Sequence, residues 1–178
     1  MKKIWLTVLT ILIVGLWSNL SFAGYKPGSE PDEFRGIKWG TDIKTLKGMK
    51  YFLTYRGIKV YKRKNEDLRI GGAKLENIGY SFWGGKFCNV LVTTKGYTNW
   101  TGLKEAVFEK LGKGNQFGDQ FIENYDWFGD ITGMSLEYNE FSEKGKLFMY
   151  SEEITKQIKA YKKEKAKEKA KEGAEEGF

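Results

Sequence analysis

Residues 77–94 read Asn-Ile-Gly-Tyr-Ser-Phe-Trp-Gly-Gly-Lys-Phe-Cys-Asn-Val-Leu-Val-Thr-Thr, two β-rich runs that meet at Gly84–Gly85. A Gly-Gly pair tolerates the positive φ that a two-residue hairpin turn requires, so this stretch predicts a β-hairpin. The turn sets the following opposite pairs: Phe82 with Phe87, Tyr80 with Asn89, and Ile78 with Leu91. In this register the returning strand is apolar on both faces, which is typical of a strand in the middle of a sheet.

On either side of this hairpin the chain continues with short β-rich runs that end at glycine turns. These runs are residues 34–40, 49–64, 68–70, 121–128, 131–138 and 147–150. In the second of them Tyr51, Leu53 and Tyr55 alternate before Gly57, where the alternation changes and indicates a turn or a bulge. Residues 121–138 predict a second hairpin around Gly129–Asp130.

Helical periodicity is clearest around Trp100, where Leu103, Val107 and Leu111 follow at i+3, i+7 and i+11. This pattern predicts a helix over about residues 99–111, with Asn99 or Thr101 as its N-cap. Residues 41–47 predict a shorter helix that Thr41 caps. We therefore predict an α+β fold, in which the main helix lies across an antiparallel sheet of about six to eight short strands and a charged helix follows at the C-terminus.

The first 23 residues have the pattern of an export signal. Lys2 and Lys3 precede an apolar run from Ile4 to Trp17, and Ser21-Phe22-Ala23 places small residues where a signal peptidase cuts. We expect cleavage after Ala23 and a periplasmic or extracellular protein. The alternative is an uncleaved inner-membrane anchor, because residues 4–23 approach the roughly 20 residues that a membrane helix needs.

Three segments follow the predicted cleavage site. Residues 24–33 contain both prolines of the chain and predict an extended leader. Residues 34–151 predict a single α+β domain. Residues 152–178 contain eight Lys and seven Glu and few large apolar residues, so we expect a charged tail that is helical or disordered.

The charge balance indicates which partners the protein can bind. The chain has a net charge of +7, and residues 24–151 carry 20 basic and 16 acidic side chains that are interspersed along the sequence. A mildly basic domain favours an anionic membrane surface or an acidic partner. It lacks the segregated basic patch of a nucleic-acid-binding protein, and export is a further argument against nucleic acid.

The residue types that the sequence lacks exclude several kinds of catalytic and metal site. The chain has no histidine, which excludes Ser-His-Asp and Cys-His nucleophilic sites and histidine-based zinc sites. Cys88 is the only cysteine, so we expect a small buried side chain in a strand rather than a disulfide or a reactive thiol. Gly71-Gly72-Ala73 lacks the spacing of dinucleotide and P-loop motifs. We predict no cofactor and no metal.

Three carboxylates remain as candidate catalytic groups. Glu123, Asp126 and Asp130 surround aromatic residues of the second hairpin, and a carboxylate pair near aromatic rings can hydrolyse a cell-wall glycan. However, Asp130 belongs to the predicted turn, and Glu123 and Asp126 have opposite strand parity, so their side chains should point apart.

Two groups of residues are candidates for binding. Arg56 and Lys62 belong to the densest basic run of the domain, which can bind anionic headgroups or an acidic partner, or can protect a sheet edge from pairing. Trp39, Trp83 and Trp127 lie at or near glycine turns, where aromatic residues line a binding surface or close the core, and Trp83, Trp127 and Tyr125 are the candidates for binding. Of the three tryptophans we expect Trp83 to be the most exposed, because it lies at the end of the central hairpin.

Four short stretches resemble a group of small exported bacterial proteins of unknown function. They are Phe-Arg-Gly-Ile-Lys-Trp-Gly at 34–40, Gly-Gly-Ala-Lys-Leu at 71–75, Ile-Gly-Tyr-Ser-Phe-Trp-Gly-Gly-Lys-Phe at 78–87 and Tyr-Asp-Trp-Phe-Gly-Asp-Ile-Thr at 125–132. The resemblance covers most of residues 34–151 and implies a bacterial protein outside the cytoplasm. It implies no catalytic residue.

The sequence therefore favours a non-catalytic, exported envelope protein that binds a protein or another envelope component. The alternatives are a carboxylate-dependent hydrolase of cell-wall glycan and a membrane-tethered spacer.

Overall fold

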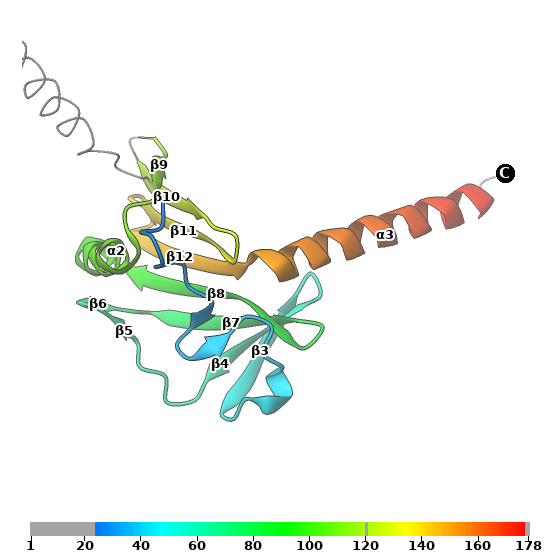
Figure 1. The fold of residues 1–178 in the computed structure, drawn as a ribbon, viewed down its shortest axis with the longest axis horizontal. Helices are drawn as coiled ribbons and strands as arrows, with labels where there is room; N and C mark the ends of the chain where they lie inside the picture. The colour runs from blue at the N-terminus through cyan, green and yellow to red at the C-terminus, as the bar shows by residue number, and fades with distance from the viewer. Residues whose placement is uncertain (1–23, 120, 177–178) are drawn as a thin grey trace, which may run out of the picture.

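The computed structural model describes residues 24–119 and 121–176, so the predicted export signal and its cleavage site lie outside the described residues. The chain forms an α+β fold around an eight-stranded antiparallel sheet (Figure 1). The strands of this sheet are β3 (Met49–Tyr55), β4 (Ile58–Arg63), β7 (Asn77–Trp83), β8 (Lys86–Lys95), β9 (Asn115–Phe117), β10 (Ile122–Phe128), β11 (Thr132–Asn139) and β12 (Lys144–Ser151).

Two halves of the chain meet in the middle of the sheet. The strand order is β3-β4-β7-β8-β12-β11-β10-β9, so the first half of the sheet comes from residues 49–95 and the second from residues 115–151. The halves join where β8 pairs with β12 in antiparallel register. As a result, β3 and β9 form the two edges of the sheet.

Two small hairpins and one short turn accompany the sheet. The hairpins are β1 (Glu33–Phe34) with β2 (Ile37–Lys38), and β5 (Arg69–Ile70) with β6 (Ala73–Lys74). The helix predicted over residues 41–47 is only a single 3₁₀ turn, η1 (Ile43–Thr45), which Asp42 caps instead of Thr41. The Thr41 carbonyl accepts a hydrogen bond from Phe87 N at 2.9 Å, and this contact ties Thr41 to β8, outside the turn.

The central hairpin has the predicted turn but not the whole predicted register. Phe82 lies opposite Phe87, as the Gly84–Gly85 turn requires. Further along, the predicted pairs are wrong, because Tyr80 lies opposite Val90 and Ile78 opposite Val92. A β-bulge between the Phe82–Phe87 and Tyr80–Val90 pairs leaves Cys88 without a partner on β7 and reverses the side-chain alternation along β8.

This bulge divides the side chains of β8 between the two faces of the sheet. We call the face that carries the large core the inner face; Phe87, Val90 and Val92 belong to it. Cys88 points to the opposite, outer face, where it is buried as the sequence predicts.

Helix α2 (Tyr97–Leu111) covers the inner face. The predicted stripe of Trp100, Leu103, Val107 and Leu111 is buried against the sheet, and the helix ends at Leu111, as predicted, with Gly112 as its C-cap. The helix begins two residues before Asn99, because Gly96 is the N-cap residue with a φ of 82°. The Asn99 side chain is used elsewhere: its oxygen accepts a hydrogen bond from Lys74 N at 3.0 Å and its nitrogen donates to the Lys95 carbonyl.

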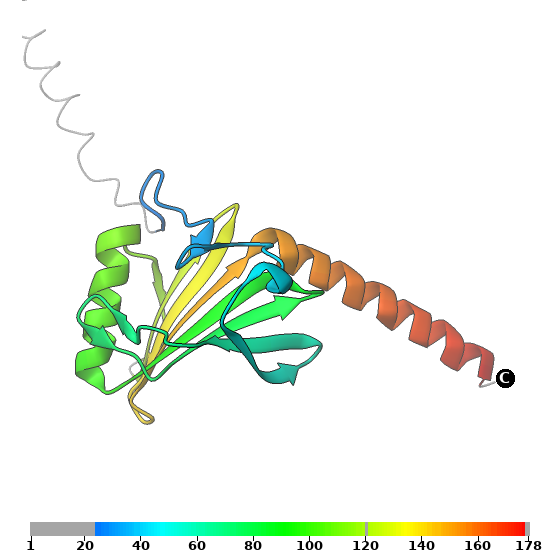
Figure 2. The ribbon, with the colours of Figure 1, turned by 90° about the horizontal axis from the view of Figure 1, so that it is seen from below.

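Helix α3 (Glu152–Glu176) begins on the outer face and then leaves the body of the protein, at the opposite end of the sheet from α2 (Figure 2). Ser151 caps it by accepting a hydrogen bond from Ile154 N at 3.3 Å. Ile154 and Ile158 pack against Cys88, so the first turns are docked and the charged remainder projects from the domain. In the described ranges, no helix has the length and apolar content required to cross a membrane.

Candidate functional site

Glu123 lies on the inner face of β10, where three donors converge on its carboxylate. Trp100 Nε1 donates to Oε2 at 2.9 Å, while Lys104 Nζ at 2.8 Å and the Tyr125 hydroxyl at 2.6 Å donate to Oε1. Burial raises the pKa of Glu123, but the hydrogen bonds from Lys104, Tyr125 and Trp100 outweigh it, so the net shift is downward. Glu123 therefore stays ionised, joins α2 to the sheet, and is a poor proton donor.

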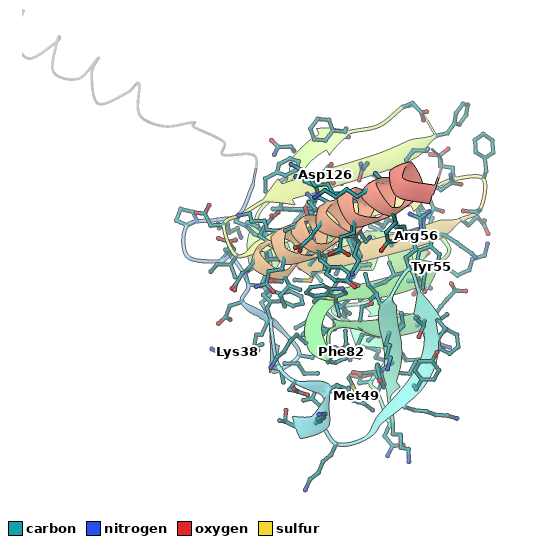
Figure 3. All side chains as sticks on the ribbon, turned by 90° about the vertical axis from the view of Figure 1, so that its right-hand side faces the viewer. Lys38, Met49, Tyr55, Arg56, Phe82 and Asp126 are labelled. Atoms are coloured by element: carbon teal, nitrogen blue, oxygen red, sulfur yellow. The ribbon has the colours of Figure 1, made fainter. Side chains whose placement is uncertain are left out.

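The other two candidate carboxylates lie elsewhere. Asp126 is opposite Ser135 on the outer face, beside α3 in the view of Figure 3, and burial raises the pKa of its carboxyl group. Asp130 is exposed in the loop between β10 and β11. The structure thus separates Glu123 and Asp126 by the thickness of the sheet, as their strand parity indicates, and no acid and base pair forms between them.

Two of the candidate aromatic residues are part of the core. Trp127 is completely buried and donates a hydrogen bond from Nε1 to the Gly112 carbonyl at 3.2 Å. Tyr125 is buried on the same face, and its ring packs edge-on against Phe108 with centroids 4.9 Å apart. Neither side chain presents a surface to a partner in this structure.

Trp83 is partly covered by the C-terminal helix. Its ring packs edge-on against Tyr161 with centroids 5.7 Å apart, and it borders the cluster of Cys88, Ile154 and Ile158. The side chain predicted to be the most exposed of the three is therefore half-buried, because α3 docks on this end of the sheet.

A cavity of about 500 Å³ lies between α2, the β1–β2 hairpin and the inner face of the sheet. Its apolar wall is formed by Phe34, Ile70, Val107, Leu111, Leu147 and Met149. At its rim Arg35 is paired with Glu66 and Asp32 with Lys38, so these charges are bound within the protein. Among the described residues, no group of three or more acidic or cysteine side chains is placed to hold a metal ion.

Arg56 and Lys62 lie on the hairpin formed by β3 and β4, which is the exposed edge of the first half of the sheet. Arg56 and Gly57 form its turn with φ values of 50° and 80°, and this turn points to the same end of the molecule as α3 (Figures 1 and 3). The Arg56 guanidinium lies 5.3 Å from the ring centroid of Tyr55, and the Lys62 ammonium lies 4.2 Å from that of Phe52. Each cation is therefore held against an aromatic ring.

The aromatic residues of β3 are exposed, in contrast to those of the core. The exposed fractions are 53% for Tyr51, 54% for Phe52 and 62% for Tyr55, and Leu53 is also exposed. Aromatic side chains of this size contribute most of their free energy when they are buried. Other aromatic residues are exposed as well, among them Tyr97, Phe128 and Phe141, but β3 carries four exposed apolar side chains within five residues.

A β-bulge at Phe52 gathers several of these side chains on one face. Leu53 pairs with Val60, Tyr55 with Ile58 and Lys50 with Lys62, and Ile58 packs against the α3 cluster, so all of them belong to the outer face. Phe52 joins them because its ring contacts Lys62. We call this set the outer-hairpin surface: Lys50, Phe52, Leu53, Tyr55, Arg56 and Lys62.

The charge of this part of the chain has one sign. Residues 43–64 contain eight Lys and Arg side chains and no Asp or Glu. Two acidic residues flank this range. Asp42 is paired with Lys86, and Glu66, which Arg63 approaches at 3.8 Å, accepts hydrogen bonds from Arg35 and from the Tyr80 hydroxyl that turn its carboxylate toward the inner face. The basic and aromatic side chains of the hairpin thus face solvent without acidic neighbours from their own segment.

Phe52, Leu53 and Tyr51 were not among the binding residues that the sequence analysis predicts. The alternation over residues 49–55 predicts a strand, but the exposure of its side chains depends on the place of that strand at the edge of the sheet. The absence of acidic residues over 43–64 was the feature of the sequence that could have indicated a binding surface here.

Comparison of the chain with protein-family models, with curated proteins and with solved structures finds no match.

Proposed function

We propose that this protein is a non-catalytic, exported envelope protein that binds an anionic partner or envelope component through the outer-hairpin surface. The observation that carries the proposal is the exposure of Phe52, Leu53 and Tyr55 beside Lys50, Arg56 and Lys62, with no acidic residue in the same segment. Aromatic and basic side chains that share a surface bind anionic groups through charge and through desolvated ring faces.

The arrangement of the carboxylates supports binding over catalysis. Glycoside hydrolysis needs two carboxyl groups that flank one bond at roughly 5–9 Å. Glu123 is held ionised against α2, whereas Asp126 lies on the other face of the sheet. The hydrolase alternative would require a different pair of groups.

Export belongs to the same proposal. The charged start, apolar run and small-residue end of residues 1–23 are the features of a cleaved signal. Sequencing the N-terminus of the protein from the envelope fraction tests this point. A chain that begins at Gly24 agrees with it, and one that retains residues 1–23 instead favours the tethered spacer, for which the projecting helix α3 would be the spacer segment.

Site-specific photocrosslinking tests the binding surface. A photoreactive phenylalanine analogue at Tyr55 should give a crosslinked product in living cells, since this side chain is exposed at the centre of the surface. The matched control is the same analogue at Tyr97, which is equally exposed at 63% but lies at the start of α2. No product from position 55, or the same products from both positions, would contradict the proposal.

A further inference from the structure

We infer that the outer-hairpin surface docks on the surface of an anionic lipid bilayer, with Phe52, Leu53 and Tyr55 at headgroup level and Lys50, Arg56 and Lys62 against lipid phosphates. This inference rests on the proposed binding function and specifies the chemistry of the partner. It does not involve the N-terminal segment.

The first argument is that the exposed apolar side chains lie on one face of the hairpin. A bilayer contacts one face of a hairpin, so a membrane-binding hairpin must gather its apolar side chains on that face. A regular strand would divide Phe52 and Leu53 between opposite faces. The bulge between Tyr51 and Leu53 places both on the outer face, next to Tyr55.

The second argument is the placement of cations beside aromatic rings. Tyrosine and tryptophan prefer the membrane interface because one end of the side chain is apolar and the other polar, and lysine extends its aliphatic stem so that its ammonium reaches the phosphates. Lys62 lies across the Phe52 ring at 4.2 Å, and Arg56 across the Tyr55 ring at 5.3 Å. Each ring on this surface therefore has a cation next to it.

The third argument separates a bilayer from an acidic peptide. An extended peptide would bind to the free edge of β3 by strand addition, which needs an uninterrupted row of backbone donors and acceptors. The bulge at Phe52 interrupts this row in the middle of the strand, and Lys50 adds a charge of the kind that protects edges from pairing. The edge thus disfavours strand addition, while the adjoining face retains its apolar and basic side chains.

The surface also continues onto the outer face of the sheet without an acidic side chain. Val60 is opposite Ser81 on β7, and Gly79 of that strand is opposite Leu91, which is exposed and lies opposite Phe148. On this side the acidic residues begin at β10 and β11, where Glu137 is paired with Lys146. Helix α3 is close to neutral, since it carries eight Lys and seven Glu.

Co-sedimentation with lipid vesicles tests the inference. The protein is used in the form that is purified after export from an expression host. Vesicles of phosphatidylcholine with phosphatidylglycerol should bind the protein, and vesicles of phosphatidylcholine alone should not. Binding should weaken as salt is raised, because surface charges are screened within about 10 Å at 0.1 M salt. The double variant Lys50→Gln, Lys62→Gln should reduce binding by about fivefold for each lysine removed.

Matched variants distinguish this surface from net charge and from general apolarity. Lys110→Gln removes a charge from the last turn of α2, and Tyr97→Ser removes a tyrosine as exposed as Tyr55. We expect Tyr55→Ser to weaken vesicle binding and both control variants to leave it within twofold of the original protein. Near-ultraviolet circular dichroism checks that each variant is folded.

Three outcomes would overturn the inference: equal binding to both kinds of vesicle, unchanged binding of the double variant, or an equal loss in the control variants. A glutamate-rich peptide serves as the competing ligand. If the protein binds this peptide and not the vesicles, the lipid inference is wrong while the proposed binding function stands. If neither binds and position 55 gives no crosslink in cells, both are wrong.

Discussion

Hairpins β10–β11 and β3–β4 lie toward opposite edges of the sheet, and each contains a seven-residue strand with aromatic side chains. In β10 the exposed fractions of Tyr125 and Trp127 are 4% and 0%. In β3 those of Tyr51 and Tyr55 are 53% and 62%. Phe128 at the end of β10 is exposed, but the aromatic side chains in the middle of that strand are buried, whereas those of β3 face solvent.

The difference arises from what covers each hairpin. Helix α2 lies over β10, where Phe108 packs on Tyr125 and the Gly112 carbonyl accepts the Trp127 indole hydrogen. In β3 the partners of Tyr51 belong to its own hairpin: its ring packs edge-on against Tyr61 with centroids 5.8 Å apart, and its hydroxyl forms a hydrogen bond with Thr54. Both strands carry aromatic side chains in an alternating pattern, and the position of a covering helix decides whether these side chains belong to the core or to the surface.

Truncating an aromatic side chain in each hairpin should give the largest contrast. Trp127→Ala removes a fully buried indole and should lower the free energy of unfolding by about 3–5 kcal/mol. Tyr55→Ala should change it by less than about 0.5 kcal/mol, because the side chain is mostly exposed. Urea unfolding measures both values. A similar loss in both variants would show that the outer hairpin is packed in solution.

Removing the partial cover that α3 provides should have an intermediate effect. Ile158→Ala should weaken the docking of α3 by about 2 kcal/mol, since Ile158 is buried against Cys88. Burial raises the pKa of the Cys88 thiol to about 11, so in the intact protein the thiol is both covered and protonated at neutral pH. The rate of labelling by a thiol reagent should rise in the variant.

Lys159→Ala is the control for this experiment, because Lys159 lies on the exposed side of the same helical turn. Equal labelling of Cys88 in Ile158→Ala and the original protein would contradict the docking of α3 on the outer face.

The smallest expected effects concern two carboxylates of β10, Glu123 on the inner face and Asp126 on the outer face, whose pKa values are shifted in opposite directions. The pKa of Glu123 is lowered, so its stabilising effect is present at neutral pH and is lost as the pH falls through and below the ordinary glutamate value of about 4.3. Glu123→Gln should lower the free energy of unfolding at neutral pH by about 1 kcal/mol and reduce its dependence on acid.

Asp126 should behave in the opposite way. Its pKa is raised by burial, so its contribution to stability is present at low pH and is lost as the pH rises through the folded-state pKa. Asp126→Asn should therefore leave stability at neutral pH unchanged or slightly increased. Urea unfolding over about pH 3 to 7 measures both variants, and losses of the same sign would show that the two carboxylates share one environment.

Local periodicity was sufficient to predict the main helix and the outline of the sheet. Trp100, Leu103, Val107 and Leu111 are one face of α2 because their spacing fits a helix, whatever the rest of the chain does. The opposite directions of Glu123 and Asp126 follow from strand parity in the same way.

The register beyond the central turn could not be derived from the turn alone. A plain two-residue hairpin would place the polar Asn89 opposite Tyr80, on the face of Phe87, and this conflict was the signal for a bulge. In the structure Cys88 takes the extra position and Asn89 reaches the half-buried outer face. The exposure of Phe52 depends on β8 pairing with β12, a contact between distant parts of the chain that local patterns do not contain.

The bulge at Cys88 also limits how this chain can evolve. Because β8 has one residue more than β7 at this point, deletion of Cys88 would remove the bulge and one side chain of the α3 cluster, while every later residue of the strand would keep its partner on β7 and its face. Insertion of a second residue there would instead require a wider bulge or turn each later side chain to the other face.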